Sequence, residues 1–554
     1  MTKPSELYFL PLGGSGEIGM NLNLYGYKNQ WLMVDLGITF VEKPGADIAT
    51  PDIRYIESRI KDLKGLVVTH GHEDHIGAIP HLWSRLGCPI YATPFTAELV
   101  HRKLKEVGLD KAATVHVVPL QGRIDIGDFN IEFIDLTHSI PEPTALAIRT
   151  PAGTVLHTGD WKIDSDPLVG NNIDTNRLKE IGDEGVMALV CDSTNIFVEG
   201  RTESEAWVRN ELRKLMTNIS GRIIMACFAS NVARLQTAMT LAKDLGRKIA
   251  FAGRSMDRFY EVGRKCGYLE AQSHVVDLRE AARLDPSEAF ILCTGSQGEN
   301  NAALKRMALG KHPRARLRDD DTVVFSSRVI PGNEKDIHAL ERLLKTRGIQ
   351  VYTSENASTH VSGHPAQEDL KDMYAWVRPK VLIPVHGEDA HLEAHGKFGL
   401  DQGIPHAVVP HNGTKIRLCG DQAEIVETVH SGRLILDGVT LVQDNAGHFK
   451  DRDHLSEAGH IAITLVVNKD GNLMSDPQVT LVGVCAPEAE KSFIKELDRT
   501  IRGSLKVMPT NGRLDNEVLR ADVMKGLHKV LRNTRGKVPS MSTHIVRLKP
   551  KPKK

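Results

Sequence analysis

Residues 67–81, VVTHGHEDHIGAIPH, place four side chains that can bind a metal ion within six positions: His70, His72, Asp74 and His75. Imidazole and carboxylate ligands without cysteine suit zinc or manganese. A single histidine is usually an ordinary core or surface residue, but a cluster this dense predicts a metal site. The spacing differs from HExxH, in which one helix face supplies two ligands to a single zinc. It is compatible with two adjacent metal ions.

Two metal ions need further ligands, and three candidates follow other strand-like segments. They are His138 in DLTHS, Asp160 in HTGDW and His386 in IPVHGE. The seven cysteines are scattered singly, which argues against a thiolate site and for reduced thiols in a cytoplasm. The sequence lacks a secretory signal pattern and a long apolar run. We therefore expect a cytoplasmic protein that uses no membrane.

Short strands and helices must position these ligands. Residues 64–69, KGLVVT, predict a buried strand that ends at the histidine cluster, and the apolar spacing after it predicts a helix that stops at Gly87. Residues 13–19, GGSGEIG, match GxGxxG, but a strand-like segment follows instead of the helix that a dinucleotide site requires. We interpret these glycines as a tight turn.

The chain of 554 residues is too long for one core, and its pattern changes along the sequence. In the middle, apolar strands alternate with amphipathic helices, which predicts a parallel, doubly wound unit. The strand-and-histidine pattern then returns, so we expect one domain interrupted by another. The expected limits are a split core at 1–202 and 350–425, an insert at 203–349, a linker at 426–448 and a C-terminal α/β domain at 449–554.

Charge is balanced over the chain but not locally. Lys and Arg number 70, as do Asp and Glu, so a globally basic nucleic-acid binder is not indicated. Residues 304–318, LKRMALGKHPRARLR, and the C-terminal RLKPKPKK are basic. For each stretch the sequence leaves two interpretations open, a solvated surface or a patch that attracts phosphates.

Four motifs in this order, THGHEDH, DLTHS, HTGD and PVHGE, resemble the metal-binding signature of the metallo-β-lactamase superfamily. The insert resembles that of the β-CASP group, with LVCDSTN and THVSGH similar to its motifs. CFASN, TGSQGE and SSRVIPGNE are similar to bacterial ribonuclease J. The resemblance implies an α/β protein in which a metallo-β-lactamase αββα sandwich is interrupted by a doubly wound β-CASP domain. A small C-terminal α/β domain follows.

The resemblance also implies roles for individual residues. His70, His72 and His138 would hold one zinc ion, Asp74, His75 and His386 a second, and Asp160 would bridge them. Asp35 would orient a histidine ligand, although a plain strand-end turn residue is the alternative. Asp192 would hold a ligand or the nucleophile, His364 would stand near the scissile phosphate, and Asp74 would also serve catalysis. Ser230, His360, Ser362 and Gly363 resemble a pocket for a terminal phosphate, with a polar turn and a helix N-cap as the alternatives.

The activity implied is RNA hydrolysis in RNA maturation and decay. It would combine a 5′-to-3′ exonuclease that favours 5′-monophosphate RNA with endonuclease cleavage, driven by hydroxide generated between two zinc ions and leaving 5′ phosphates. Mn²⁺ or Mg²⁺ would be alternative metals. Expected partners are single-stranded RNA, further copies in a homodimer or homotetramer, and an RNA-degradation complex. The alternatives are a β-CASP nuclease for DNA, a small-molecule hydrolase and a catalytically silent RNA-processing scaffold.

Overall fold

The structure is a computed structural model that describes residues 6–330 and 332–548. The chain forms two compact units. One contains the residues up to Val41 and Ile48–Leu436, and the other contains Glu42–Asp47 and the chain from Asp437 onward. Among the described helices, none has both the length and the apolar character needed to cross a bilayer.

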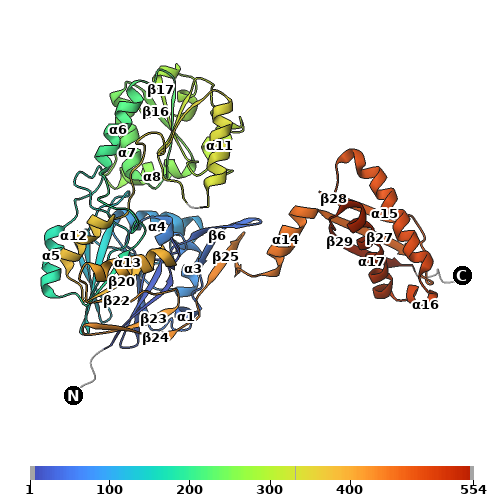
Figure 1. Cartoon of the computed structure of the whole chain (residues 1–554), viewed down its shortest axis with the longest axis horizontal. Helices are drawn as coiled ribbons and strands as arrows, with labels where there is room; N and C mark the ends of the chain where they lie inside the picture. The colour runs from blue at the N-terminus through green and yellow to red at the C-terminus, as the bar shows by residue number, and fades with distance from the viewer. Residues whose placement is uncertain (1–5, 331, 549–554) are drawn as a thin grey trace. The chain divides into compact units, whose positions relative to one another are not determined.

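The core of the first unit is two β-sheets packed face to face (Figure 1). The first sheet has the order β24 (Gln422–Thr428), β23 (Thr414–Cys419), β1 (Leu7–Gly13), β3 (Leu22–Tyr27), β4 (Gln30–Val34), β7 (Leu63–Val67), β8 (Ile90–Ala92) and β9 (Val115–Val117). The second has the order β10 (Arg123–Ile126), β11 (Phe129–Asp135), β12 (Thr144–Thr150), β13 (Gly153–His157), β14 (Ala188–Asp192), β20 (Val381–Val385) and β22 (His406–Ala407). Phe9 and Val34 from the first sheet pack against Phe133 and Ile383 from the second.

Helices cover the outer faces of both sheets, which makes four layers. The helices of this domain are α1 (Arg54–Glu57), α2 (Glu73–Ile76), α3 (Ile79–Leu86), α4 (Pro94–Glu106), α5 (Thr175–Glu184), α12 (Gln367–Val377) and α13 (Asp389–Asp401). Leu178 of α5 and Leu370 of α12 pack on the outer face of the second sheet. Strands β14 and β20 are therefore buried along their whole length and apolar except for Asp192 at the end of β14, because both of their faces are covered.

The insert is a five-stranded parallel sheet between helices (Figure 1). Its strand order is β16 (Lys248–Ala252), β17 (Ala289–Cys293), β15 (Ile223–Ala226), β18 (Thr322–Phe325) and β19 (Gln350–Tyr352). Its helices are α6 (Glu205–Thr217), α7 (Val232–Asp244), α8 (Arg254–Lys265), α9 (Leu278–Ala281), the 3₁₀ turn η1 (Pro286–Glu288), α10 (Ala303–Ala308) and α11 (Glu334–Thr346). The doubly wound unit that the sequence predicted is therefore present.

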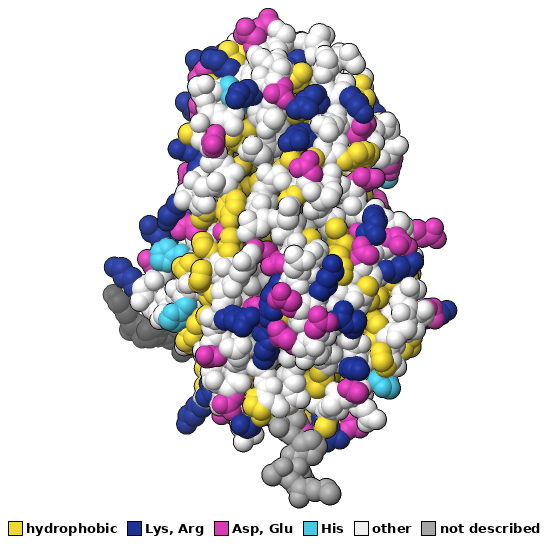
Figure 2. Space-filling model, turned by 90° about the vertical axis from the view of Figure 1, so that its left-hand side faces the viewer, with side chains coloured by type: hydrophobic (Ala, Val, Ile, Leu, Met, Phe, Trp, Pro, Cys, Tyr) yellow, Lys and Arg dark blue, Asp and Glu magenta, His cyan; other side chains and the backbone are white. Residues whose placement is uncertain are grey.

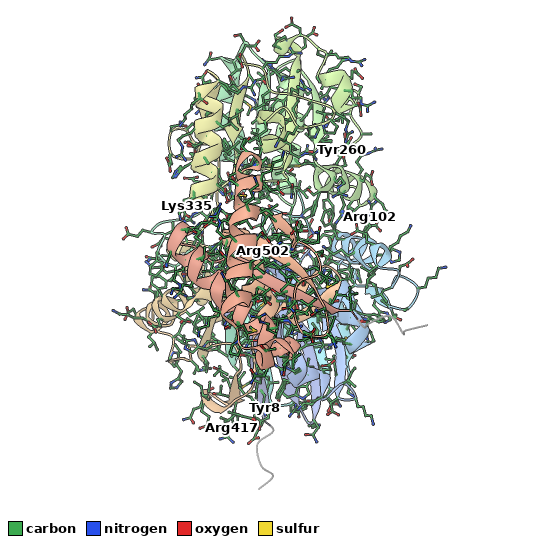
Figure 3. The ribbon with its side chains drawn as sticks, turned by 90° about the vertical axis from the view of Figure 1, so that its right-hand side faces the viewer. Tyr8, Arg102, Tyr260, Lys335, Arg417 and Arg502 are labelled. Atoms are coloured by element: carbon green, nitrogen blue, oxygen red, sulfur yellow. The ribbon has the colours of Figure 1, made fainter. Side chains whose placement is uncertain are left out.

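Ion pairs join helix α8 of the insert to helix α4 of the core. Arg102 of α4 contacts Glu261 of α8 at 2.9 Å, and Arg258 of α8 contacts Glu106 of α4 at 2.7 Å. Figure 3 labels Arg102 of α4 and Tyr260 of α8. On the face shown in Figure 2, basic and acidic side chains are mixed over the surface.

Two boundary regions differ from the pattern read in the sequence. We expected residues 350–352 to belong to the core, but β19 pairs with β18 and completes the sheet of the insert. Helix α11 connects β18 to β19. The stretch expected as a linker contains the strands β25 (Arg433–Asp437) and β26 (Thr440–Gln443). Near the start of the chain lie β5 (Thr39–Lys43) and β6 (Ala46–Pro51), and β25 pairs with β6. The remaining domain limits stay predictions.

The second unit contains α14 (Gly447–Ala458), β27 (His460–Val467), β28 (Gln478–Val482), α15 (Pro487–Val507), α16 (Thr510–Arg513), α17 (Asn516–Arg535) and β29 (Ser540–Arg547). β27 pairs with β28 antiparallel and with β29 parallel. Alternate residues of β27 are buried against apolar residues that recur every four positions in α15 and α17. Most of the basic C-terminal tail lies outside the described residues.

Candidate metal centre

The candidate ligands lie at one edge of the sandwich, where parallel strands end. β13, β14 and β20 are parallel neighbours, and β7 ends at the matching edge of the first sheet. His70 follows β7, Asp160 follows β13 and His386 follows β20. Because the carboxyl ends of parallel strands meet at one edge, residues far apart in the chain converge there.

One group of ligand atoms comes from His70, His72, His138 and Asp160, all within 4.8 Å of one another. Nε2 of His70 and Nε2 of His138 each lie 3.1 Å from Nδ1 of His72. Burial lowers the pKa of His70 and His138 well below the usual range, and it lowers the pKa of His72 to about 4. All three rings are thus neutral near pH 7, which is the form that binds metal ions.

The loop at Gly363 holds one of these rings in place. Nδ1 of His138 donates to the carbonyl oxygen of Gly363 at 2.6 Å, so Nε2 faces the other ligands. A Cβ on Gly363 would lie 2.5 Å from Cε1 of His138. Glycine therefore lets the loop lie flat against the ring of this candidate ligand.

The second group comes from Asp74, His75, Asp160 and His386, again within 4.8 Å. Nε2 of His386 lies 3.1 Å from Oδ2 of Asp74, and Nε2 of His75 lies 3.2 Å from Oδ2 of Asp160. Burial would lower the pKa of His75 and His386, but the neighbouring carboxylates, Asp160 foremost, raise both well above the usual range. The two groups share Asp160, whose buried Oδ1 has no hydrogen-bond partner among the described residues.

Hydrogen bonds to other residues orient the second group. Nδ1 of His75 donates to Asp35 at 2.7 Å, and Asp35 in turn accepts from the backbone N–H and hydroxyl of Thr69. Nδ1 of His386 lies 2.8 Å from Oγ1 of Thr194, which donates to Asp192. Asp35 and His386 adopt left-handed backbone conformations, with φ of 62° and 55°. Strained conformations of this kind concentrate at functional sites.

The glycine turn at residues 13–19 supports the same group. The backbone N–H of His386 donates to the carbonyl oxygen of Gly14 at 2.6 Å. Gly14 has a φ of +84°, and strand β3 rather than a helix follows the turn. The turn interpretation is confirmed, and its structural role is to hold a candidate ligand.

His364 stands beside both groups and is held by Asp192. Nδ1 of His364 donates to Oδ2 of Asp192 at 2.7 Å. Burial opposes protonation of His364, but Asp192 raises its pKa above the usual value. Asp160, Asp192, His364 and His386 form a third set that could hold a cation. Since the Asp192 carboxylate is already engaged by His364 and Thr194, we assign Asp192 to orienting these side chains.

Three of the residues expected to grip a phosphate, His360, Ser362 and Gly363, lie in the same loop as His364. Asn195 donates to Oγ of Ser362 at 2.8 Å and to the carbonyl oxygen of His364 at 3.0 Å. Nδ1 of His360 is buried and has no partner among the described residues. Ser230 precedes α7, whose N-cap is Asn231, and within the described chain no hydrogen bond links the Ser230 side chain to the other three residues. The N-cap interpretation is thus confirmed for Asn231.

Sequence reasoning missed several residues that connect the insert to this site. Arg328 donates to Asn195 at 2.9 Å, and the fully buried Arg234 donates to Glu205 and to the carbonyl oxygen of Thr359. Thr194 and Asn195 lie two and three positions after Asp192, so their place in the CDSTN motif was an available signal. Arg328 lies in SSRVIPGNE, but nothing in that motif indicates which residue it contacts.

Comparison with known proteins identifies the family. The model of the "Metallo-beta-lactamase superfamily" matches residues 21–172, and "Ribonuclease J, beta-CASP domain" matches 220–343. "Zn-dependent metallo-hydrolase RNA specificity domain" matches 355–408, and "Ribonuclease J C-terminal domain" matches 447–548. Ribonuclease J of Sinorhizobium meliloti is 39% identical over 99% of this chain and 98% of its own length.

The chain belongs to the ribonuclease J family. Ribonuclease J 1 of Streptococcus pyogenes is 36% identical over 96% of this chain and 95% of its own length. A crystal structure of a protein of unknown function from Enterococcus faecalis matches with a TM-score of 0.51 at 17% identity, over 74% of this chain and all of that one. That likeness concerns the fold alone.

Family membership confirms the fold class expected from the sequence. A metallo-β-lactamase domain carries an inserted β-CASP domain and is followed by the C-terminal domain of the ribonuclease J family. The candidate centre is assembled from both matched parts of the core, because His70 to Asp160 lie in one and His364 and His386 in the other.

Proposed function

We propose that this protein is a metal-dependent ribonuclease that acts in RNA maturation and decay in the cytoplasm. The convergence of two ligand groups on Asp160, with His364 beside them, is the observation that carries the proposal. We further propose 5′-to-3′ exonuclease action that favours 5′-monophosphate RNA, together with endonuclease cleavage. Membership of the ribonuclease J family supports an RNA substrate.

The residues fit two divalent cations. Each group offers four nitrogen or oxygen atoms within 4.8 Å, and the shared carboxylate has a buried oxygen without a partner among the described residues. His70, His72 and His138 would hold one ion, Asp74, His75 and His386 the other, and Asp160 both. Zinc suits this donor set, with manganese or magnesium as substitutes. Such ions supply a nucleophile at neutral pH and neutralise charge on the phosphate.

The residues of the chain provide orientation and a proton. Asp35 and Thr194 fix the rings of His75 and His386, so their Nε2 atoms point to the centre. Asp192 holds Nδ1 of His364, which leaves Nε2 of His364 available to donate a proton to the leaving 3′ oxygen. Cleavage on that side of the phosphate leaves the 5′ phosphate on the product.

The loop that carries His364 is the best placed to distinguish RNA ends. Asn195 holds Ser362 and the His364 carbonyl, and Arg328 reaches Asn195 from the insert. We propose that Ser362, Gly363, His360 and Ser230 line the position of a terminal phosphate. A silent scaffold would not need seven converging ligands, and a small-molecule hydrolase would not need the large insert. The homo-oligomer and the degradation complex remain predictions.

A cleavage assay tests the proposal. RNA labelled at the 3′ end or internally is offered with a 5′ monophosphate, triphosphate or hydroxyl, with zinc present and Mn²⁺ or Mg²⁺ added. Release of mononucleotides chiefly from the monophosphate RNA is the expected result. Internal fragments independent of the 5′ end would make the protein mainly an endonuclease. Absence of cleavage by protein shown to hold two metal ions would refute ribonuclease activity.

A further inference from the structure

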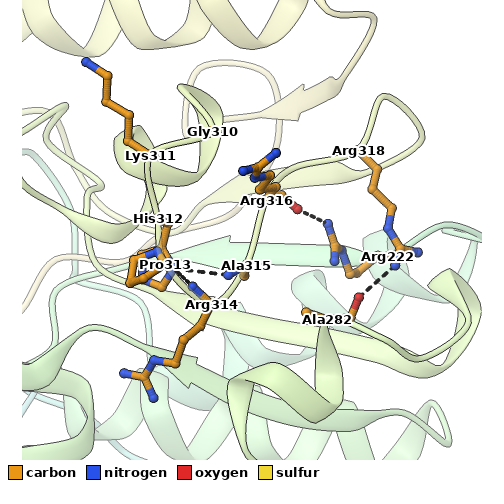
Figure 4. Close-up of a pocket in the computed structure, with 10 residues that line it drawn as sticks. All are labelled: Arg222, Ala282, Gly310, Lys311, His312, Pro313, Arg314, Ala315, Arg316 and Arg318. Atoms are coloured by element: carbon orange, nitrogen blue, oxygen red, sulfur yellow. Dashed lines mark hydrogen bonds between the residues drawn. The ribbon is translucent and has the colours of Figure 1, made fainter.

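The insert contains a second feature, a basic pocket formed by the loop between α10 and β18. The pocket has a volume of about 470 Å³. Its lining residues are Arg222, Ala282, Gly310, Lys311, His312, Pro313, Arg314, Ala315, Arg316 and Arg318 (Figure 4). Five of the side chains are cationic and none is acidic. We refer to these ten residues as the distal pocket.

The distal pocket lies at the opposite end of the insert's sheet from the metal centre. Arg222 precedes β15, Ala282 precedes β17 and residues 310–318 precede β18, so the lining comes from the amino ends of parallel strands. The carboxyl ends of the same strands lead to Ser230 and to Arg328, which donates to Asn195 in the core. The four residues of β15 alone separate the two edges by about 13 Å.

Internal hydrogen bonds fix the shape of the distal pocket. The buried Arg222 binds Asp321 at 2.7 Å and donates to the carbonyl oxygen of Arg316 at 2.8 Å. Arg318 donates to the carbonyl oxygen of Ala282 at 2.8 Å. Nδ1 of His312 accepts the backbone N–H groups of Arg314 and Ala315. The loop is therefore pre-organised without a ligand, which lowers the entropic cost of binding one.

Much of the positive charge in this pocket is not neutralised. Among the described residues, no carboxylate within 4 Å pairs with Lys311, Arg316 or Arg318, whereas Arg222 is paired with Asp321. Arg314 is 3.8 Å from Asp277. Burial, Arg306 and Arg314 lower the pKa of His312. The charged residues that line the pocket are all positive, whereas cations and carboxylates are mixed on the face shown in Figure 2.

We infer that the distal pocket binds the phosphodiester backbone of RNA at a distance from the cleavage site. This inference rests on the proposed ribonuclease function. Figure 4 shows Lys311 and Arg314 extending away from the loop in different directions, while Arg318 reaches to the carbonyl oxygen of Ala282. Cations spread in this way match an extended polyanion better than one compact phosphate, and guanidinium groups match phosphate oxygens in geometry. The pocket thus anchors a downstream segment of a long substrate.

The test compares the double variant Lys311→Ala/Arg316→Ala with the parent chain. Arg222 and Arg318 are left intact because they support the loop. The metal-loaded, full-length proteins are titrated with hydrolysis-resistant phosphorothioate RNA of about 6 or about 30 nucleotides at several salt concentrations. We expect the variant to bind the long RNA about tenfold more weakly and to lower the slope of log Kd against log salt by about 1.4. The loss should be confined to the long RNA.

The variant Lys243→Ala/Arg342→Ala is the matched control. Lys243 and Arg342 are exposed in the insert and do not line the pocket. The control variant removes two positive charges, as the pocket variant does. Equal weakening by the control would show a diffuse charge effect and overturn the inference. Unchanged binding of the long RNA by the pocket variant would also overturn the inference. Polyglutamate that competes with the long RNA as strongly as unlabelled RNA does would overturn it as well. If the parent fails to cleave any RNA, the proposed function itself fails, which the parallel cleavage assay detects.

Discussion

The two ligand groups of the metal centre differ in what surrounds them. The group of His70, His72 and His138 has neutral rings held by Thr69 and by the carbonyl oxygen of Gly363. The group of Asp74, His75 and His386 has its own carboxylate, and its rings are supported by Asp35 and by Thr194 with Asp192. Imidazole favours zinc, whereas carboxylates favour harder ions such as Mn²⁺. The two groups therefore form two candidate metal positions with different ligand types, which share Asp160 as a common ligand.

The substitution with the largest expected effect is Asp160→Ala, because it removes the residue common to both groups. We expect both metal ions to be lost and kcat/KM on RNA to fall by about 10³-fold or more. Elemental analysis counts the metal ions, and thermal unfolding checks that the variant is folded. A folded variant that keeps two ions and near-normal cleavage would show that Asp160 is not the bridge.

Replacing His364 should separate chemistry from metal binding. His364→Asn removes the proposed proton donor but leaves both ligand groups intact. We expect kcat to fall by about 10²-fold to 10³-fold with the metal content unchanged. If the variant instead loses a metal ion, His364 is a ligand, and the set with Asp192 and His386 is a metal position in its own right.

A pair of substitutions tests whether the two groups respond independently. Asp35→Asn weakens the support of His75, and Gly363→Ala forces a methyl group to within 2.5 Å of the present position of the His138 ring. Each should lower the affinity for one metal ion by about 10-fold to 100-fold and leave the other unchanged. Competition with a chelator measures both affinities. Equal loss of both ions in each variant would contradict the division into two groups.

How well the sequence predicts this centre depends on how far apart in the chain the contacting residues lie. The seven candidate ligands could be selected in advance because four cluster after one strand-like segment and three follow other such segments, and the structure brings them together. Asp35 was indicated only by the family resemblance. The hydrogen bond from His138 to the carbonyl oxygen of Gly363 was not predicted, because the two residues are 225 positions apart. The link from Arg328 to Asn195 joins the insert to the core across 133 positions. No local pattern encodes such a contact, because it depends on how the two domains pack.

The same reasoning explains the misread boundaries. β19 precedes a histidine-rich loop, so its sequence resembles the core, yet its backbone hydrogen bonds go to β18 in the insert. Strands β25 and β26 have too few residues to show a clear alternation.

The smallest expected effect concerns the recognition of RNA ends. Ser362→Ala removes the hydroxyl that accepts from Asn195 but touches neither ligand group. We expect the preference for a 5′ monophosphate over a triphosphate to fall by about 3-fold to 10-fold, the value of one hydrogen bond of about 1 kcal/mol. Relative cleavage rates of the two RNAs measure it. An unchanged preference would place the terminal phosphate elsewhere.

Anomalous diffraction tests the two-position account most directly. Crystals grown with zinc and manganese are measured at the absorption edge of each element. The account predicts two peaks about 3.5–4 Å apart on either side of Asp160, with zinc among His70, His72 and His138 and manganese enriched beside Asp74. A single peak, or peaks that do not share Asp160, would contradict it.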